Sequence, residues 1–383
     1  MSEQEIYERF VDWLGNTWWE LTESDHRMPM IRAHYTPEEA ALLTGVPHGS
    51  KTLEEIAAAK GMDPGELGPK LKELARKGMV YESRKGDSVR YRLNDSFFAL
   101  MRANLWPGRT DERTKKTAPL INQYFLDGWF DQFREVHTKG LRAIPIEKTM
   151  EDTRQVLPFE DVVKVVEDRS YYTVSSCPCR HRHNLDPGMA DCNHPTEVCL
   201  HFDELGRYIV ENGLGREITK EETLEILRKS ADSGLVHGIS NYKENPDTIC
   251  NCCSCCCMWL EGHHKMGHKA SLEASNYKVR VEAESCKGCA LCVKRCPMDA
   301  LQLRVSAEAK NKVGKVAVVD LDLCIGCGVC VHKCPGDALA LVRNQAITEP
   351  QQTAREWGAR FAAEREAGRK REDVDPSLRR NVR

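Results

Sequence analysis

The 383-residue sequence has no long hydrophobic run and no marked excess of charge of either sign. No apolar stretch approaches the ~20 residues that a membrane-spanning helix needs, so no membrane span is expected. The first 30 residues, which begin MSEQEIYERF, lack the basic start, apolar middle and cleavage site of a secretory signal. A formal net charge of -3 argues against a chain that is basic throughout in order to bind nucleic acid. The expected location is therefore cytoplasmic.

Cysteine is absent from residues 1–176 and 335–383, so all 18 cysteines lie between positions 177 and 334. Because disulfides are rare in the cytoplasm, this concentration of thiols indicates metal binding rather than crosslinking. Residues 1–176 and 335–383 must have a role other than binding metal through thiolates. The chain therefore divides into at least three parts.

In residues 1–115 the sequence predicts three short helices followed by a two-stranded hairpin. Thr36 and Thr52 are expected to cap the first two helices, and Pro64 to begin a third that stops at Gly78. The hairpin is expected to turn at Gly86, between alternating apolar residues. This order of elements resembles a winged helix-turn-helix domain.

That resemblance does not by itself imply DNA binding. The third helix begins with residues 65–69, GELGP, and offers Lys70 and Lys72 as contacts for bases or phosphates. Dimerisation or docking of a partner protein is therefore favoured over DNA contact. Two aromatic, amphipathic helices expected at residues 5–20 and 117–133 could form such an interface.

Two cysteine runs near the C-terminus repeat one another. Residues 286–297 read CKGCALCVKRCP and residues 324–335 read CIGCGVCVHKCP. Each has two, two and three residues between its cysteines and a closing proline, which is the bacterial ferredoxin pattern. In such repeats three thiolates of one run hold a cluster and the fourth ligates the other cluster. The pattern predicts one 4Fe-4S cluster at Cys286, Cys289, Cys292 and Cys334, and a second at Cys324, Cys327, Cys330 and Cys296.

This segment resembles an eight-iron dicluster ferredoxin, which implies one-electron transfer between partners. A strand is expected before each run and a short helix after it. Gly288, Gly326 and Gly328 are expected to let backbone N–H groups approach the cluster sulfurs. Because the sequence contains no G-x-G-x-x-G fingerprint, P-loop or flavin motif, we expect the electrons to come from a redox partner protein.

The ten remaining cysteines form two groups in residues 116–278. The first group is Cys177, Cys179, Cys192 and Cys199, and the second is Cys250, Cys252, Cys253, Cys255, Cys256 and Cys257. In an extended segment Cys177 and Cys179 would point to the same side. In the second group, extended backbone would separate Cys253, Cys255 and Cys257 from Cys250, Cys252 and Cys256. A helix would instead bring Cys252, Cys253 and Cys256 together, with Cys257 near Cys253.

Neither geometry lets six closely spaced thiols face one small cluster. We therefore expect two further iron–sulfur clusters, one on each side of this stretch, whose ligand sets are completed by the first group. Ten thiols are two more than two cubane clusters need, so two would be free, bridging or part of a larger assembly. One unusual cluster and a zinc site are the alternatives. Arg180 and Arg182 are expected either to offset thiolate charge or to form ordinary ion pairs.

The order of parts also resembles a group of multi-cysteine iron–sulfur proteins of anaerobic bacteria. These have a winged-helix start, a C-x-C-R segment, a C-L-x-F segment, an I-C-N-C-C-x-C-C-C segment and a dicluster ferredoxin end. The matching segments here are residues 177–180, 199–202 and 249–257 and the two ferredoxin runs. The resemblance implies electron transfer in anaerobic metabolism and no particular reaction.

The sequence thus predicts an α+β multidomain protein. Its expected parts are N-terminal helices with a winged helix-turn-helix (1–115), a central cysteine-rich α/β iron–sulfur domain (116–278), a dicluster ferredoxin domain (279–345) and a charged helical tail (346–383). The expected function is an electron relay to or from a partner redox enzyme, as a homodimer or as a subunit of a larger complex. Two alternatives stay open: a reductase whose central cluster acts on a small molecule, and a redox-sensing DNA-binding regulator.

Overall fold

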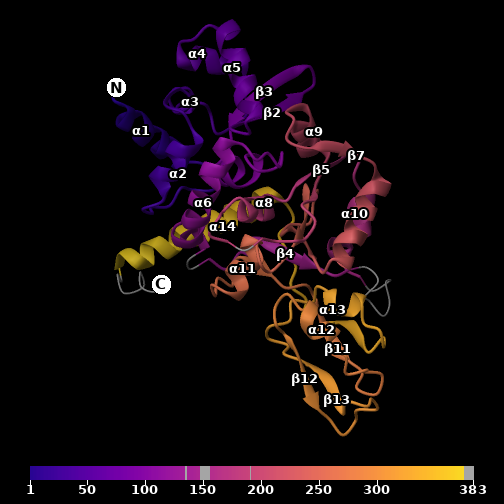
Figure 1. The fold of residues 1–383 in the computed structure, drawn as a ribbon. Coiled ribbons are helices and arrows are strands. Elements are labelled where there is room, and N and C mark those ends of the chain that lie inside the picture. The colour runs from indigo at the N-terminus through magenta and orange to yellow at the C-terminus, as the bar shows by residue number, and fades with distance from the viewer. Residues whose placement is uncertain (134–135, 147–155, 190, 375–383) are drawn as a thin grey trace.

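The computed structural model describes residues 1–133, 136–146, 156–189 and 191–374. In these residues helices and strands are mixed, with strands arranged in several separate sheets, which confirms the predicted α+β class. Figure 1 shows the N-terminal helices at one end, the last cysteine-rich segment at the other, and the central strands between them. None of the described helices combines the length and the apolar character that crossing a membrane requires.

The N-terminal part contains the predicted helices and hairpin. Its helices are α1 (Glu3–Gly15), α2 (Arg27–His34), α3 (Pro37–Leu43), α4 (Leu53–Lys60) and α5 (Pro64–Arg76), and its strands are β1 (Lys51–Thr52), β2 (Val80–Lys85) and β3 (Ser88–Leu93). Thr36 and Thr52 form capping boxes at α3 and α4. The strands pair antiparallel in the order β1-β3-β2. The assignment to the winged helix-turn-helix class stays a prediction.

A helical segment links this part to the central sheet. It comprises the π-helix η1 (Phe97–Ala103), α6 (Glu112–Asp127) and the 3-10 helix η2 (Trp129–Phe133). The expected first helix over residues 5–20 ends earlier, at Gly15, and Trp18 and Trp19 follow it in an irregular segment. This early end matters for the site, because both tryptophans line the central cavity.

A seven-stranded sheet forms the centre, in the order β10-β4-β8-β9-β6-β5-β7. Its strands are β4 (Leu141–Ile144), β5 (Tyr172–Ser176), β6 (Glu197–Phe202), β7 (Arg216–Ile218), β8 (Val236–Ser240), β9 (Thr248–Cys252) and β10 (Leu272–Glu273). The neighbouring helices are η5 (Pro158–Glu160), α7 (Val162–Glu167), α8 (Pro178–Asn184), α9 (Asp203–Glu211), α10 (Lys220–Asp232) and α11 (Met258–His264). β10 and β4 pair in parallel, whereas the other neighbours are antiparallel.

The last cysteine-rich segment contains two antiparallel strand pairs and two short helices. The pairs are β11 (Tyr277–Val281) with β14 (Leu339–Arg343) and β12 (Leu301–Val305) with β13 (Lys315–Val319); the helices are α12 (Leu291–Arg295) and α13 (Val329–His332). The expectation of a helix after each run was wrong, because each helix lies inside its run and a strand follows. Cys296 follows α12 with an extended backbone, and it lines the same small cavity as Cys324, Cys327 and Cys330 of the other run.

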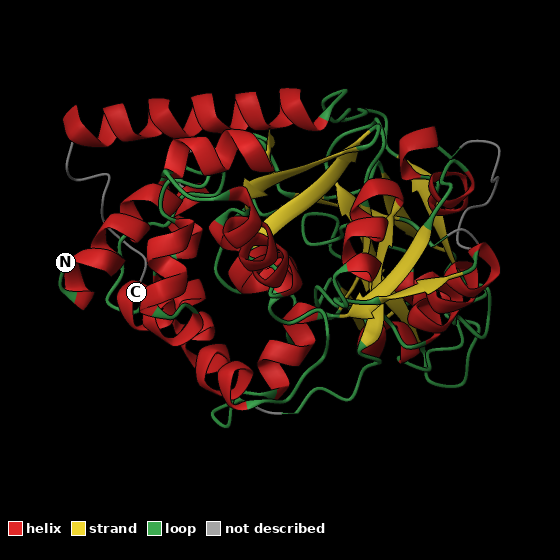
Figure 2. Ribbon diagram, turned by 90° about the horizontal axis from the view of Figure 1, so that it is seen from above, coloured by secondary structure: helices red, strands yellow, loops and turns green. Residues whose placement is uncertain are grey.

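One continuous hydrophobic core joins these parts and includes the C-terminal helix α14 (Ala354–Val374). The sequence indicated a solvated helix here, but Trp357 and Phe361 are 6% and 1% exposed. Trp357 stacks on Trp18 with ring centroids 5.6 Å apart, and the Glu364 carboxylate accepts backbone hydrogen bonds from residues 137 and 138. Figure 2 shows mainly helices on one side of the molecule and strands mixed with helices on the other. Two aromatic residues one helical turn apart therefore hold an otherwise charged helix against the core.

Candidate metal centres and the central cavity

The cysteines of the two C-terminal runs lie in the exchanged sets that the repeat predicts. Cys286, Cys289, Cys292 and Cys334 surround one small cavity, which we call the first ferredoxin set. Cys296, Cys324, Cys327 and Cys330 surround a second, the second ferredoxin set. Burial and, less strongly, the other three thiols of its set raise the pKa of Cys292 to about 11. A metal that accepts thiolates would relieve this crowding; that these eight thiols are cluster ligands remains a proposal.

Glycines shape the backbone around these sets. Gly288, Gly326 and Gly328 have φ angles of 64°, 66° and 77°. A Cβ at Gly326 would lie 2.1 Å from the carbonyl oxygen of Tyr277. Glycine is thus needed at position 326 both for its left-handed backbone and for the close approach of the neighbouring chain. Whether these positions direct N–H groups at cluster sulfurs stays a prediction.

The second ferredoxin set lies on the side that faces the central sheet. The carbonyl of Cys327 accepts a hydrogen bond from the Ile146 N–H at 3.2 Å, and Ser275 donates to the carbonyls of residues 325 and 326 at 3.0 and 2.9 Å. The first ferredoxin set is held instead by contacts inside its own segment, such as the bond from Asn311 to the Cys286 carbonyl at 2.8 Å. The second set is therefore the one closer to the central cysteines.

The ten central cysteines come together through strands, turns and helix ends rather than along one regular element. Cys177 precedes the first residue of α8 and Cys179 lies inside it, so the extended geometry expected for this pair was wrong. Cys250 and Cys252 lie in β9, a turn covers residues 254–256, and Cys257 precedes α11. Both regular geometries considered for the second group therefore fail in detail, although the thiols do separate into two sets.

Four of the thiols form a compact group, which we call the four-thiol set. Its members are Cys192, Cys253, Cys255 and Cys256, whose Sγ atoms all lie within 4.8 Å of one another. Cys255 is exposed and the other three are buried. Hydrogen bonds from Cys255 and Cys256 hold the pKa of the Cys253 thiol well below its usual value. The group thus already favours a thiolate, which is the form that binds metal.

The other six thiols form a string, which we call the six-thiol set. Contacts between neighbours join them in the order Cys177, Cys179, Cys257, Cys252, Cys250 and Cys199. Hydrogen bonds from Cys199 and Cys252 lower the pKa of Cys250, whereas the same contacts raise the pKa of those two partners. Not all six can be thiolates together unless a cation offsets their charge. The donor set therefore fits a metal centre, and it has two thiols more than one cubane cluster needs.

Two buried arginines lie between the two sets. Arg180 and Arg182 are 0% and 2% exposed. Arg180 donates to the carbonyl of Asn251 at 2.6 Å, and Arg182 donates to that of Cys256 at 3.4 Å. Among the residues that the structure describes, Nε of both and Nη1 of Arg182 have no hydrogen-bond partner. Burial lowers the pKa of Arg180, but the Cys177 and Cys253 thiolates raise it above its usual value. Buried cations of this kind fit a site that carries excess thiolate charge.

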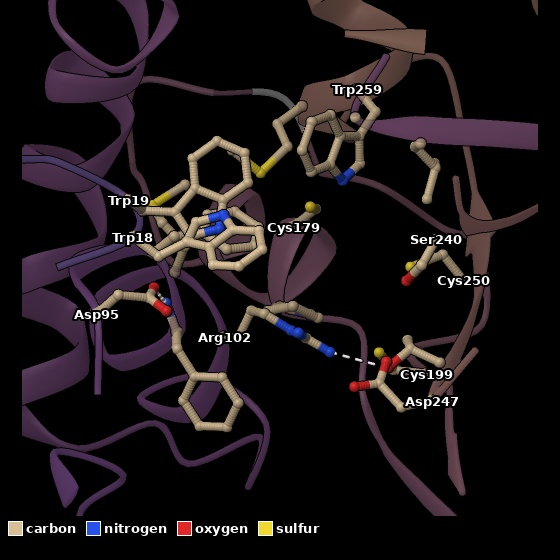
Figure 3. Close-up of a pocket in the computed structure, with 18 of the residues that line it drawn as sticks. Trp18, Trp19, Asp95, Arg102, Cys179, Cys199, Ser240, Asp247, Cys250 and Trp259 are labelled. Atoms are coloured by element: carbon tan, nitrogen blue, oxygen red, sulfur yellow. Dashed lines mark hydrogen bonds between the residues drawn. The ribbon is translucent and has the colours of Figure 1, made fainter. Parts of the chain in front are cut away.

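A cavity of about 510 Å³ opens beside the six-thiol set. Figure 3 shows Trp18 and Trp19 on one side and Cys199, Cys250 and Ser240 on the other. The cavity walls come from the N-terminal part, the central sheet and α14, and every thiol of the six-thiol set lines it. Its size is that of a small-molecule site, and aromatic walls with a few polar groups are typical of such sites.

Polar groups gather on the thiol side of the cavity. The Arg102 guanidinium donates to Thr248 Oγ1 at 2.9 Å. Its charge helps to lower the pKa of Cys250 and offsets part of the rise in the pKa of Cys199. Asp95 lines the opposite side of the cavity, near Trp18 (Figure 3), and burial raises the pKa of its carboxyl. Sequence reasoning missed these residues because they lie far from the cysteines along the chain. Trp259 is the one missed cavity residue that the sequence could have pointed to, because it follows the last cysteine of the second group by two positions.

Comparison with known proteins bears on the C-terminal part of the chain. Residues 278–335 match the family model for a 4Fe-4S dicluster domain. Among curated proteins no sequence matches this chain. The chain therefore carries a C-terminal 4Fe-4S dicluster domain, joined to a cysteine-rich part that holds a further compact group of thiols.

Proposed function

We propose that this protein is an iron–sulfur oxidoreductase that reduces a small molecule in the central cavity. Electrons would enter through the dicluster domain and reach a metal centre held by the six-thiol set. The observation that carries this proposal is the 510 Å³ cavity. Electron transfer between proteins does not require a cavity with aromatic walls next to the thiols, whereas binding of a small molecule does. When bound, iron–sulfur clusters supply one-electron transfer.

The contact between the dicluster domain and the central sheet supports such a route. Asn251 lies between Cys250 and Cys252, and its Oδ1 is 2.7 Å from Nδ1 of His237. Burial and, less strongly, the charge of His332 in the second ferredoxin run lower the pKa of His237 to about 4. At neutral pH His237 is therefore uncharged. Its side chain bonds Asn251 in β9, the strand that carries Cys250 and Cys252, and it also lies near His332 of the second ferredoxin run.

Cations at the cavity would stabilise the negative charge that reduction adds. Arg102 faces Cys199 and Cys250 from the cavity side, and Arg180 lies on the side of Cys177 and Cys253. In a water-poor site such charges act more strongly than in bulk solvent. The aromatic walls exclude water and would hold the apolar body of a substrate against the thiol side.

An electron relay to a redox partner protein is the second candidate. Cys289 of the first ferredoxin set is exposed, and this places the outer set where a partner could exchange electrons with it. In both candidate functions electrons would enter at the first ferredoxin set. They differ in whether a small molecule reaches the six-thiol set.

The structure gives little support to a DNA-binding regulator. Lys72 was one of two lysines of α5 considered for nucleic-acid contact. Its Nζ donates to both carboxylate oxygens of Glu82 at 3.0 Å and to Asn212 at 3.3 Å. Because Lys72 already pairs inside the molecule, we expect no binding to a promoter fragment even at low salt.

Carbon monoxide tests whether the cavity gives access to a reactive metal, because it binds reduced iron that has an open coordination position. We expect an infrared band when the dithionite-reduced protein is exposed to carbon monoxide. Replacing Ser240 with phenylalanine should fill the thiol side of the cavity and abolish the band, with the iron content unchanged. Absence of the band from the unaltered protein would favour the relay.

Docking of the dicluster domain depends in part on Asp232 at the end of α10. Its carboxylate lies 2.8 Å from His332 Nε2 and 2.5 Å from Lys333 Nζ, and these partners lower the pKa of Asp232 to about 2. The carboxylate is therefore charged at neutral pH. Asp232→Asn should slow reduction of the central centre up to about fivefold, since a partly exposed pair contributes ~1 kcal/mol. Stopped-flow absorbance would measure this rate.

Glu225→Gln is the matched control for that experiment. Glu225 lies on the same helix and pairs with Arg228 and Lys229 of α10 rather than with the dicluster domain. It should leave the rate unchanged. Equal rates in both variants and the unaltered protein would show that Asp232 does not control docking.

A further inference from the structure

We propose that the four-thiol set, Cys192, Cys253, Cys255 and Cys256, binds a single zinc ion rather than an iron–sulfur cluster. Its thiols are as close together as the ligands of one metal ion. Sγ of Cys192 is 3.5 Å from that of Cys255 and 3.9 Å from that of Cys253, and the Sγ atoms of Cys255 and Cys256 are 3.5 Å apart. Tetrahedral zinc with Zn–S bonds of ~2.3 Å separates its sulfur ligands by ~3.8 Å.

The ferredoxin sets of the same chain provide the contrast. In a 4Fe-4S cluster each thiolate ligates a different iron, so the thiolates surround the cluster and stay apart. Both ferredoxin sets are arranged in this way, around small cavities. Among the residues that the structure describes, the four-thiol set is the one group of metal-ligating side chains whose donor atoms all lie within 4.8 Å of one another. The structure therefore distinguishes two kinds of thiol site.

The six-thiol set differs from the four-thiol set in the same respect. Each of its members interacts most strongly with one or two of the others, and among the described residues its donor atoms do not form a group within 4.8 Å of one another. A string of this kind along a cavity wall suits a centre with several metal atoms. The ten central cysteines thus separate into one mononuclear site and one larger site, not into two similar clusters.

The four-thiol set is held in place by the surrounding backbone. Cys253 follows β9 directly, and Cys255 and Cys256 belong to the turn before α11. Cys192 comes from the segment between α8 and β6, where Asn184 accepts from its N–H at 2.9 Å and donates to its carbonyl at 3.2 Å. The ligand most distant in sequence is therefore fixed by two hydrogen bonds.

The charges around the set also suit a zinc tetrathiolate, in which four thiolates carry more negative charge than one Zn²⁺ neutralises. Arg180 is fully buried, and its charge lies close to the thiols of Cys253 and Cys192; Arg182 donates to the carbonyl of Cys256. By binding all four thiolates, zinc would crosslink the Cys192 segment to the turn that precedes Cys257. Because Cys257 belongs to the six-thiol set, the ion would brace the wall of the other centre without taking part in electron transfer.

Metal content decides the proposal, and it does so independently of any reaction in the cavity. We would purify and reconstitute the full chain without oxygen and measure zinc and iron by mass spectrometry. About one zinc per chain is expected in the unaltered protein. Cys192→Ser should lose the zinc and keep its iron. Cys199→Ser, in the six-thiol set, should lose iron and keep the zinc.

Two further measurements distinguish loss of a zinc ligand from misfolding of the serine variant. Cys192→His should retain the zinc, because histidine replaces cysteine in zinc sites. Cobalt in place of zinc should give the absorption of tetrahedral cobalt thiolate, and this absorption should be absent from Cys192→Ser. The proposal would be overturned if the unaltered protein contained no zinc and Cys192→Ser lost one or more iron atoms.

Discussion

Replacing Cys250 with serine is expected to remove the iron of the six-thiol set and to abolish the carbon monoxide band. Cys250 contacts both Cys199 and Cys252, so its loss interrupts the string near one end. The dicluster domain should be unaffected, since its eight cysteines lie elsewhere. The variant should therefore retain about eight irons per chain. Iron and acid-labile sulfide analysis would measure this, and electron paramagnetic resonance of the reduced protein would identify the remaining clusters.

Ser254→Ala is the control for this variant. Ser254 lies in the turn that follows β9, among the cysteines, but has no thiol. It should keep the full iron content and the carbon monoxide band. If Cys250→Ser also kept both, the six-thiol set would not be the metal centre at the cavity, and the proposed reductase would lose its basis.

Replacing Glu160 with alanine is expected to lower the free energy of unfolding by ~3–5 kcal/mol, because it leaves a buried guanidinium without its counter-charge. Arg142 and Glu160 are 1% and 0% exposed, and the guanidinium donates to the carboxylate at 2.8 Å. Glu160 also accepts from the backbone and side chain of Asn276, the residue before β11. The carboxylate thus joins the central sheet to the start of the dicluster domain. Chemical denaturation followed by tryptophan fluorescence would measure the loss.

A double variant, Arg142→Met with Glu160→Met, separates the cost of an unpaired charge from the value of the pair itself. Apolar side chains of similar length remove both charges, and such replacements are often neutral. We expect the double variant to recover most of the lost stability. A loss below ~1 kcal/mol in Glu160→Ala would mean that water or another group compensates Arg142.

Local sequence determined the elements whose geometry depends on neighbouring residues. Thr36 and Thr52 cap helices because a side-chain oxygen reaches the N–H three residues ahead. The ferredoxin runs were predictable for a similar reason, since two, two and three residues between thiols suit one cluster shape and leave the fourth cysteine for the other cluster. The structure brings these two sets of thiols together as the repeat requires.

The sequence predicts that the central cysteines bind metal, but it does not predict which of them lie together. Strand alternation and helical periodicity each assume one regular backbone, whereas residues 248–264 pass from strand to turn to helix. Cys192 joins the four-thiol set from a segment about 60 positions away, where Asn184 holds its backbone. No periodicity along the chain could reveal that pairing.

The iron–sulfur character of the C-terminal part could be predicted from the cysteine runs, because ligand type and spacing are local properties. That six central thiols line a cavity could be learned only from the fold. The cavity walls include Trp18, Arg102, Trp259 and Trp357, which come from distant segments that share one core. Each of these side chains is ordinary in its own segment. They form a site because the packing of α14 and the N-terminal part against the central sheet brings them together.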